Sequence, residues 1–135
     1  MVKGNIKRIC IAAFCVYMIA VAVLCFIRPS SLPEVDIKTF LGIPIDKLLH
    51  FLMFLPYPFL SGMSFMSRKM SIIANMLTLI ILTVAGIGIA YGTELIQAQT
   101  DYRSYEIADF KADAIGIAIG TICTFIGMSY IKLKK

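Results

Sequence analysis

Four apolar stretches of about 20 residues each constrain this chain more than any other feature. They run Ile9–Ile27, Leu48–Met66, Ile72–Tyr91 and Phe110–Ile131. An α-helix of about 20 residues, at a rise of 1.5 Å per residue, crosses the hydrocarbon core of a bilayer. Hydrophobic residues make up 59% of the chain, well above the usual share in soluble proteins. The sequence therefore predicts one domain, residues 1–135, folded as an all-α bundle of four transmembrane helices.

Charged residues are distributed unequally outside these stretches. In the N-terminal segment, the second connection and the C-terminus, every charged residue is basic. These residues are Lys3, Lys7, Arg8, Arg68, Lys69, Lys132, Lys134 and Lys135. All eight acidic residues lie in or beside the first and third connections. The positive-inside rule then predicts that both termini are cytoplasmic and that the acidic connections face outward.

The net charge of +5 does not point to nucleic acid, because the basic residues flank the membrane stretches. In that position they set orientation and attract anionic lipid headgroups. The sequence therefore predicts membrane lipids, and not nucleic acid, as partners. It is also compatible with an oligomer. Arg28-Pro29 follows the first stretch in place of a small-residue cleavage site, so we expect a retained helix.

The four cysteines all fall within apolar stretches and lack metal-ligand spacing; they are Cys10, Cys15, Cys25 and Cys123. We expect them to be packing residues rather than a disulfide framework or a metal site. The sequence names no cofactor.

Prolines and glycines predict local features of the helices. Pro56 and Pro58 lie inside the second stretch and should kink that helix. Gly116 and Gly120 form a small-xxx-small pattern, which permits close contact with another helix. Phe40–Ile43 is an apolar patch in an otherwise polar external loop.

Polar residues gather at the outward ends of the last three predicted helices. Asp46 and His50 are four residues apart and share a helix face, as do Asp109 and Asp113. Because polar groups are costly to expose to lipid, we expect them to face one pocket. The candidate binding residues are Asp46, Lys47, His50, Glu94, Gln97, Arg103, Asp109 and Asp113.

Some of these residues have simpler interpretations. Asp46 is equally compatible with a helix cap, and Lys47 with an interfacial side chain that reaches water. Glu94 and Asp113 are different, because they follow or lie within apolar runs. A carboxylate there needs a partner such as Arg103, Lys47 or a metal ion.

The order and spacing of these residues resemble the VanZ-like family of small integral membrane proteins. The matching elements span residues of about 46–120 and are Asp46-Lys47-Leu48-Leu49-His50-Phe51, Glu94-x-x-Gln97, Arg103 and Asp109-x-x-x-Asp113-x-x-Gly116. Asp113 stands where the family pattern has Asn. The resemblance implies a cell-envelope protein of the bacterial cytoplasmic (inner) membrane, associated with low-level resistance to the glycopeptide teicoplanin. It implies no settled reaction.

Three functions are compatible with this pattern. The first is an envelope protein that alters how a lipid-linked intermediate or a lipoglycopeptide engages the outer leaflet. The second is an enzyme acting on a lipid headgroup or lipid-linked cell-wall intermediate, with His50 or Glu94 as general acid or base. In that enzyme Asp109 with Asp113 could hold a divalent cation, and Lys47 and Arg103 would clamp a phosphate. The third is a proton- or ion-coupled transporter with Glu94 and Asp113 as relay groups.

Overall fold

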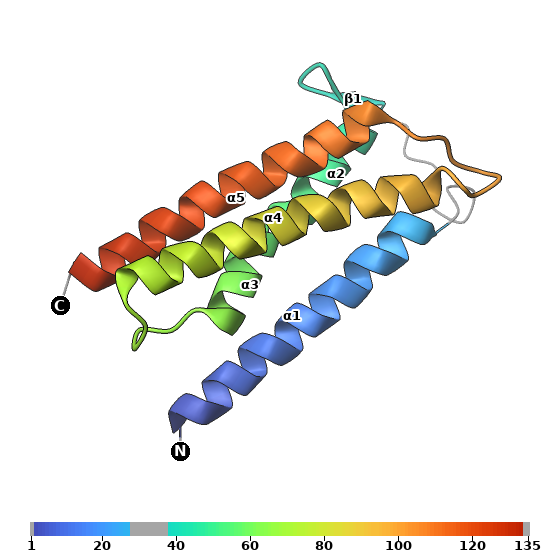
Figure 1. Ribbon diagram of the computed structural model, residues 1–135. Coiled ribbons are helices and arrows are strands. Elements are labelled where there is room, and N and C mark those ends of the chain that lie inside the picture. The colour runs from blue at the N-terminus through green and yellow to red at the C-terminus, as the bar shows by residue number, and fades with distance from the viewer. Residues whose placement is uncertain (1, 28–37, 134–135) are drawn as a thin grey trace.

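The computed structural model describes residues 2–27 and 38–133 and has an up-and-down helical bundle (Figure 1). Four segments are long and apolar enough to cross a membrane: Gly4–Phe26, Ile45–Phe65, Ile72–Gln97 and Ile107–Ile131. The prediction of an all-α bundle with four such helices is therefore confirmed. The elements are α1 (Val2–Phe26), β1 (Thr39–Phe40), β2 (Ile43–Pro44), α2 (Ile45–Phe54), α3 (Tyr57–Phe65), α4 (Ile72–Gln97) and α5 (Ile107–Leu133).

The helices extend beyond the apolar stretches. α1 begins at Val2 rather than Ile9, and α5 begins at Ile107 rather than Phe110. Backbone hydrogen bonding sets helix ends, whereas hydropathy marks only the membrane-embedded part. The earlier start of α5 places Asp109 in its first turn, where a negative charge is favourable at the helix N-terminus.

The second span is interrupted at its prolines, as predicted. α2 ends at Phe54 and α3 begins at Tyr57, with Pro56 between them and Pro58 in the first turn of α3. Proline lacks the backbone N–H that a helical hydrogen bond needs, and its ring clashes with the carbonyl group one turn earlier. The helix therefore cannot continue unchanged through this point. The prediction of a kink from Pro56 and Pro58 is confirmed.

A small hairpin forms the part of the predicted external loop that lies just before the second span. Thr39 pairs with Pro44 and Phe40 with Ile43, in antiparallel register. The two turn residues, Leu41 (φ 51°) and Gly42 (φ 79°), both have positive φ, as tight two-residue hairpin turns require. Leu41 is 88% exposed at the tip. A leucine in this conformation is uncommon, which explains why the apolar patch did not predict a turn.

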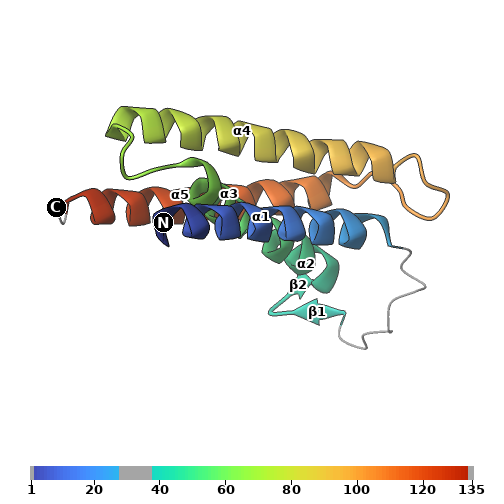
Figure 2. The same cartoon turned by 90° about the horizontal axis from the view of Figure 1, so that it is seen from below.

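The two ends of the bundle differ in content. Figure 1 places the start of α1, the α3–α4 connection and the end of α5 at one end, and the hairpin and the α4–α5 connection at the other. We call the latter the hairpin end. In Figure 2 the hairpin lies beside α2, on the side of the molecule away from α4. Arg68 and Lys69, in the α3–α4 connection, are exposed at the opposite end.

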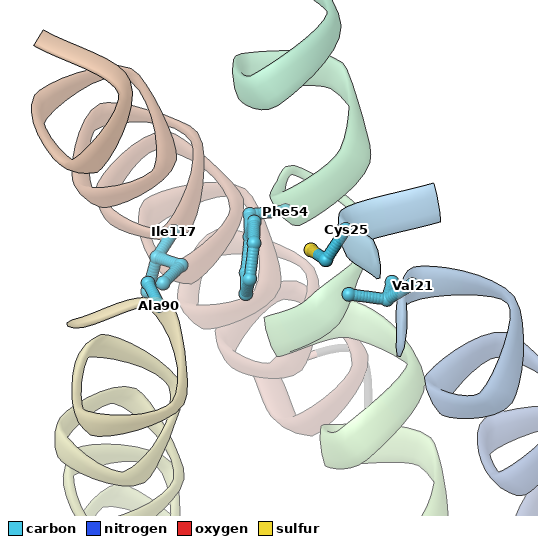
Figure 3. Close-up of a cluster of buried hydrophobic side chains, with 5 residues drawn as sticks. All are labelled: Val21, Cys25, Phe54, Ala90 and Ile117. Carbon is cyan, nitrogen blue, oxygen red and sulfur yellow. The ribbon is translucent and has the colours of Figure 1, made fainter. Parts of the chain in front are cut away.

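All four spans meet in one apolar layer. It consists of Val21 and Cys25 from α1, Phe54 from α2, Ala90 from α4 and Ile117 from α5. The Phe54 ring lies between Ala90 and Ile117 on one side and the two α1 residues on the other (Figure 3). The four cysteines are free, and Cys25 is buried in this layer, which agrees with the packing role expected for it.

Glycines bring α5 directly against α2. A Cβ atom added at Gly116 would lie 2.5 Å from the carbonyl oxygen of Phe51. One added at Gly120 would lie 2.3 Å from the carbonyl oxygen of Leu55. Both distances are much shorter than a van der Waals contact. The two helix backbones therefore approach so closely here that only glycine fits between them. The small-xxx-small pattern thus has α2 as its partner.

Candidate functional site

Lys47, in the first turn of α2, joins three carboxylates. Its Nζ lies 2.8 Å from Asp46 Oδ2 and also donates to Glu106 and Asp109. The Lys47 side chain is only 18% exposed, so it is held against these acids rather than extended into water. Asp46 was expected as a possible cap of this helix, and that expectation is wrong. The N-cap position is Pro44, without a side-chain cap bond, and Asp46 lies in the first turn.

His50, one turn further along α2, is held between two aspartates of α5. Its Nδ1 lies 3.0 Å from Asp113 Oδ1, within hydrogen-bonding distance, and its Nε2 lies 3.5 Å from Asp109 Oδ2. Asp109 therefore contacts Lys47 with one oxygen and faces His50 with the other. The four-residue spacings seen in the sequence place these side chains on facing sides of α2 and α5.

Glu94, on α4, completes the group but lacks a hydrogen bond. It is 1% exposed, and neither carboxylate oxygen has a hydrogen-bond partner among the described residues. Its Oε1 lies 4.0 Å from His50 Nδ1. Asp113 Oδ2 is likewise buried and unpaired. We refer to Lys47, His50, Glu94, Asp109 and Asp113 as the polar cluster.

Negative charge is in excess around the polar cluster. Its three carboxylates, together with Asp46 and Glu106, surround one ammonium group and one imidazole. Even with His50 protonated, three negative charges would remain uncompensated if every carboxylate were ionised. Asp46 and Glu106 are about half exposed, so solvent screens them. The charges of Glu94, Asp109 and Asp113 are buried, so Lys47, protons or cations must balance them.

The apolar layer closes the polar cluster on the side of the bundle centre. On each of α2, α4 and α5, a residue of the layer lies one helical turn inward from a residue of the cluster. The pairs are His50 and Phe54, Glu94 and Ala90, and Asp113 and Ile117. The layer thus separates the cluster from the opposite end of the bundle.

Two of the expected binding residues bind the helix α1 backbone instead of the cluster. Gln97 Nε2 and Arg103 Nη1 donate to the carbonyl oxygen of Cys25, at 2.6 and 3.0 Å, and Tyr102 donates to that of Phe26. The last carbonyls of a helix lack partners within the helix, and a cation is favourable there. Arg103 makes no ion pair with a carboxylate among the described residues, contrary to the partnership expected for it. Sequence reasoning missed this role because a backbone acceptor leaves no signature in side-chain spacing.

A cavity of about 450 Å³ lies between α1 and α2 beside the cluster. Its polar lining consists of Asp46, His50 and Arg103. The rest of the lining is apolar and comes from the end of α1 and from α2: Leu24, Cys25, Ile27, Leu49, Leu52 and Met53. The cavity therefore has both polar and hydrocarbon-like surfaces, and His50 connects it to the polar cluster.

Two groups of side chains have the spacing of metal ligands. One ligand atom from each of His50, Glu94 and Asp109 lies within 4.8 Å of the others, and these three residues are buried. A second group combines Asp109 with the exposed residues Asp46 and Glu106. The sequence suggested Asp109 with Asp113 as metal ligands. Asp109 belongs to both groups, whereas Asp113 belongs to neither and instead contacts His50.

Comparison of the chain with protein-family models, with curated proteins and with solved structures found no match.

Proposed function

We propose that this chain is a VanZ-like envelope protein that binds the phosphate-bearing headgroup of a lipid in the cavity between α1 and α2. Through that lipid it would influence the low-level response to teicoplanin-type antibiotics, which carry a lipid tail. The observation that supports the proposal most directly is the mixed lining of the cavity, with Arg103 among its polar residues. The link to teicoplanin follows from the motif resemblance alone.

The cavity suits an amphipathic ligand. Its volume of about 450 Å³ falls in the range of small-molecule sites, about 300–1,000 Å³, and is large enough for a headgroup with its first methylenes. Leu24, Leu49 and Leu52 are 53%, 60% and 48% exposed, and in this proposal that wall faces the bilayer. A lipid could therefore place its chains among the leucines and its headgroup near Arg103.

Arg103 is the phosphate ligand in this proposal. One of its nitrogens, Nη1, donates to the Cys25 carbonyl, and it has no carboxylate partner among the described residues. A guanidinium has five N–H donors, so donors remain for a phosphate, which it can bind through two parallel hydrogen bonds. The carbonyl contact fixes the group at the wall of the cavity.

The hairpin end is the outward-facing end in this proposal. The support is the unequal charge distribution, with exposed Arg68 and Lys69 at the opposite end. In intact bacterial cells, a cysteine introduced as Ser104→Cys should react with a membrane-impermeant maleimide, whereas Ser67→Cys should react only after the membrane is opened. The unmodified chain, with its four native cysteines, gives the background. The reverse labelling pattern would contradict the orientation.

Lipid binding should depend on the arginine fork. In detergent, phosphatidylglycerol should raise the melting temperature of the protein more than phosphatidylcholine does, measured at matched concentrations. Arg103→Lys keeps the charge but cannot hold the Cys25 carbonyl and a phosphate together, so we expect at least a tenfold weaker apparent affinity for phosphatidylglycerol, close to the loss in Arg103→Gln. Lys111→Gln removes an exposed charge outside the cavity and should change affinity less than twofold.

The cellular role is tested with the same variants. Cells producing the unmodified chain should require more teicoplanin for growth inhibition than cells with an empty vector, and Arg103→Gln should abolish the difference. Equal inhibition with the unmodified chain and the empty vector would contradict the antibiotic role. Equal affinity of Arg103→Lys and the unmodified chain for phosphatidylglycerol would contradict the headgroup site.

An enzyme acting on the lipid headgroup is the alternative, and one contact favours it. Asp113 accepts from His50 Nδ1 if that nitrogen is protonated, which leaves Nε2 as a base beside the cavity. Mass spectrometry of the lipid recovered after incubation distinguishes the two proposals. Unchanged lipid supports binding alone, and a headgroup product that disappears in His50→Gln supports catalysis.

A further inference from the structure

We infer that His50, Glu94 and Asp109 form a binding site for one divalent transition-metal ion, Zn²⁺ or Mn²⁺, at the wall of the cavity. This inference does not rest on the proposed lipid function. It rests on three side chains from three different spans that present ligand atoms within 4.8 Å of one another in a buried position.

The unpaired carboxylate of Glu94 is the observation that points to a ligand. A buried carboxylate normally accepts hydrogen bonds, and a protonated carboxyl group donates one, but both Glu94 oxygens lack any partner among the described residues. Glu94 is 1% exposed, so bulk water does not supply the missing partners. It offers an oxygen within metal-ligand spacing of both His50 and Asp109.

The geometry around His50 is that of a metal ligand with a supporting carboxylate. Asp113 Oδ1, 3.0 Å from Nδ1, can accept a hydrogen bond from Nδ1–H, which leaves the lone pair on Nε2. Nε2 lies 3.5 Å from Asp109 Oδ2. Two ligands bound to one zinc ion at about 2.1 Å in tetrahedral arrangement are separated by about 3.4 Å. Asp113 would therefore position the imidazole rather than bind the ion.

Charge and ligand type select the ion. With His50 neutral, as a metal ligand must be, the three buried carboxylates exceed the Lys47 charge by two, and a divalent cation would offset both. Imidazole favours zinc and other transition metals, whereas carboxylates alone favour Mg²⁺, Ca²⁺ or Mn²⁺. One imidazole with two carboxylates fits Zn²⁺ or Mn²⁺ better than Mg²⁺. The cavity, which His50 lines, gives the ion a route to the site.

Metal titration of the full chain tests the site directly. Protein purified in detergent and stripped with a chelator should bind about one equivalent of Zn²⁺ or Mn²⁺, measured by elemental analysis after desalting, with a rise in melting temperature that Mg²⁺ does not reproduce. Glu94→Gln preserves the shape but removes the charge. It should weaken the affinity at least tenfold without lowering the melting temperature of the metal-free protein. Asp113→Asn keeps an acceptor for His50 and should have a smaller effect.

Glu106→Gln is the matched control, because Glu106 belongs only to the exposed group with Asp46 and Asp109. It should change metal affinity less than twofold. If Glu94→Gln fails to fold, His50→Gln replaces it as the test variant and should also weaken metal affinity. The inference is overturned if neither ion binds stoichiometrically, if either folded variant binds as tightly as the unmodified chain, or if Glu106→Gln is the substitution that abolishes binding. Phosphatidylglycerol binding without metal binding would leave the lipid proposal intact and remove this one.

Discussion

Replacing Gly120 by alanine should destabilise the folded protein by about 3 kcal/mol, at the upper end of typical overpacking costs. The added methyl group would lie 2.3 Å from the Leu55 carbonyl oxygen, and backbone cannot move aside as a flexible side chain can. α5 would have to shift away from α2. Gly116→Ala should have a similar effect, because its methyl group would lie 2.5 Å from the Phe51 carbonyl oxygen. Thermal unfolding in detergent measures both changes.

Gly127 on the same helix provides the control. A Cβ atom there has nothing within 4 Å, so Gly127→Ala should be neutral or slightly stabilising through its better helix propensity. The shift of α5 in Gly120→Ala should also separate Asp113 on α5 from His50 on α2, so metal binding should weaken with stability. Equal melting temperatures for Gly120→Ala and Gly127→Ala would show that the helices do not pack through this surface.

Removing the Lys47 ammonium should also destabilise the folded protein, with a loss of about 2 kcal/mol in Lys47→Met. The substitution keeps most of the apolar length of the side chain but leaves Asp46, Glu106 and Asp109 facing one another without a cation. Removing one partner of a fully buried ion pair costs about 3–5 kcal/mol. We expect less here because the Asp46 and Glu106 side chains are 53% and 51% exposed, and solvent screens them.

Lys111→Met is the control. It tests whether loss of any basic residue on the spans destabilises the protein as Lys47→Met does. Lys111 is exposed on α5, so its replacement should change the melting temperature little. High salt should recover part of the stability of Lys47→Met, because it screens the three carboxylates. Adding Asp109→Asn to that variant should recover more, because it removes one of the three charges. Indistinguishable melting temperatures for Lys47→Met and Lys111→Met would contradict the bridging role of Lys47 between α2 and the start of α5.

Periodicity and length predicted the spans and much of the grouping of side chains. Four apolar stretches of membrane-spanning length became four helical spans, and the prolines located the break between α2 and α3. The four-residue spacings of Asp46 with His50 and of Asp109 with Asp113 correctly placed members of each pair on one helix face. Those spacings suffice because helix geometry fixes the relative direction of such side chains.

The orientation of the helices around one another was less accessible from the sequence. In a membrane helix both lipid-facing and helix-facing residues are apolar, so hydropathy does not identify the buried face. The roles of Gln97 and Arg103 depend on a backbone carbonyl of α1, and any residue at position 25 would offer that acceptor. The hairpin before α2 was also missed, because its turn uses a leucine with positive φ where asparagine or glycine is usual.

The apolar layer beneath the polar cluster bears on the transporter interpretation. Three residues of this layer, Phe54, Ala90 and Ile117, lie between the cluster and the centre of the bundle. Among the described residues, they close that side of His50, Glu94 and Asp113. In this arrangement, a proton or cation that reaches the cluster would leave by the end through which it entered. Such a dead-end chamber does not dissipate an ion gradient and draws no work from one. Its occupancy should follow the pH and ionic composition of a single compartment and be nearly indifferent to membrane voltage, because a charge entering it crosses only part of the transmembrane field.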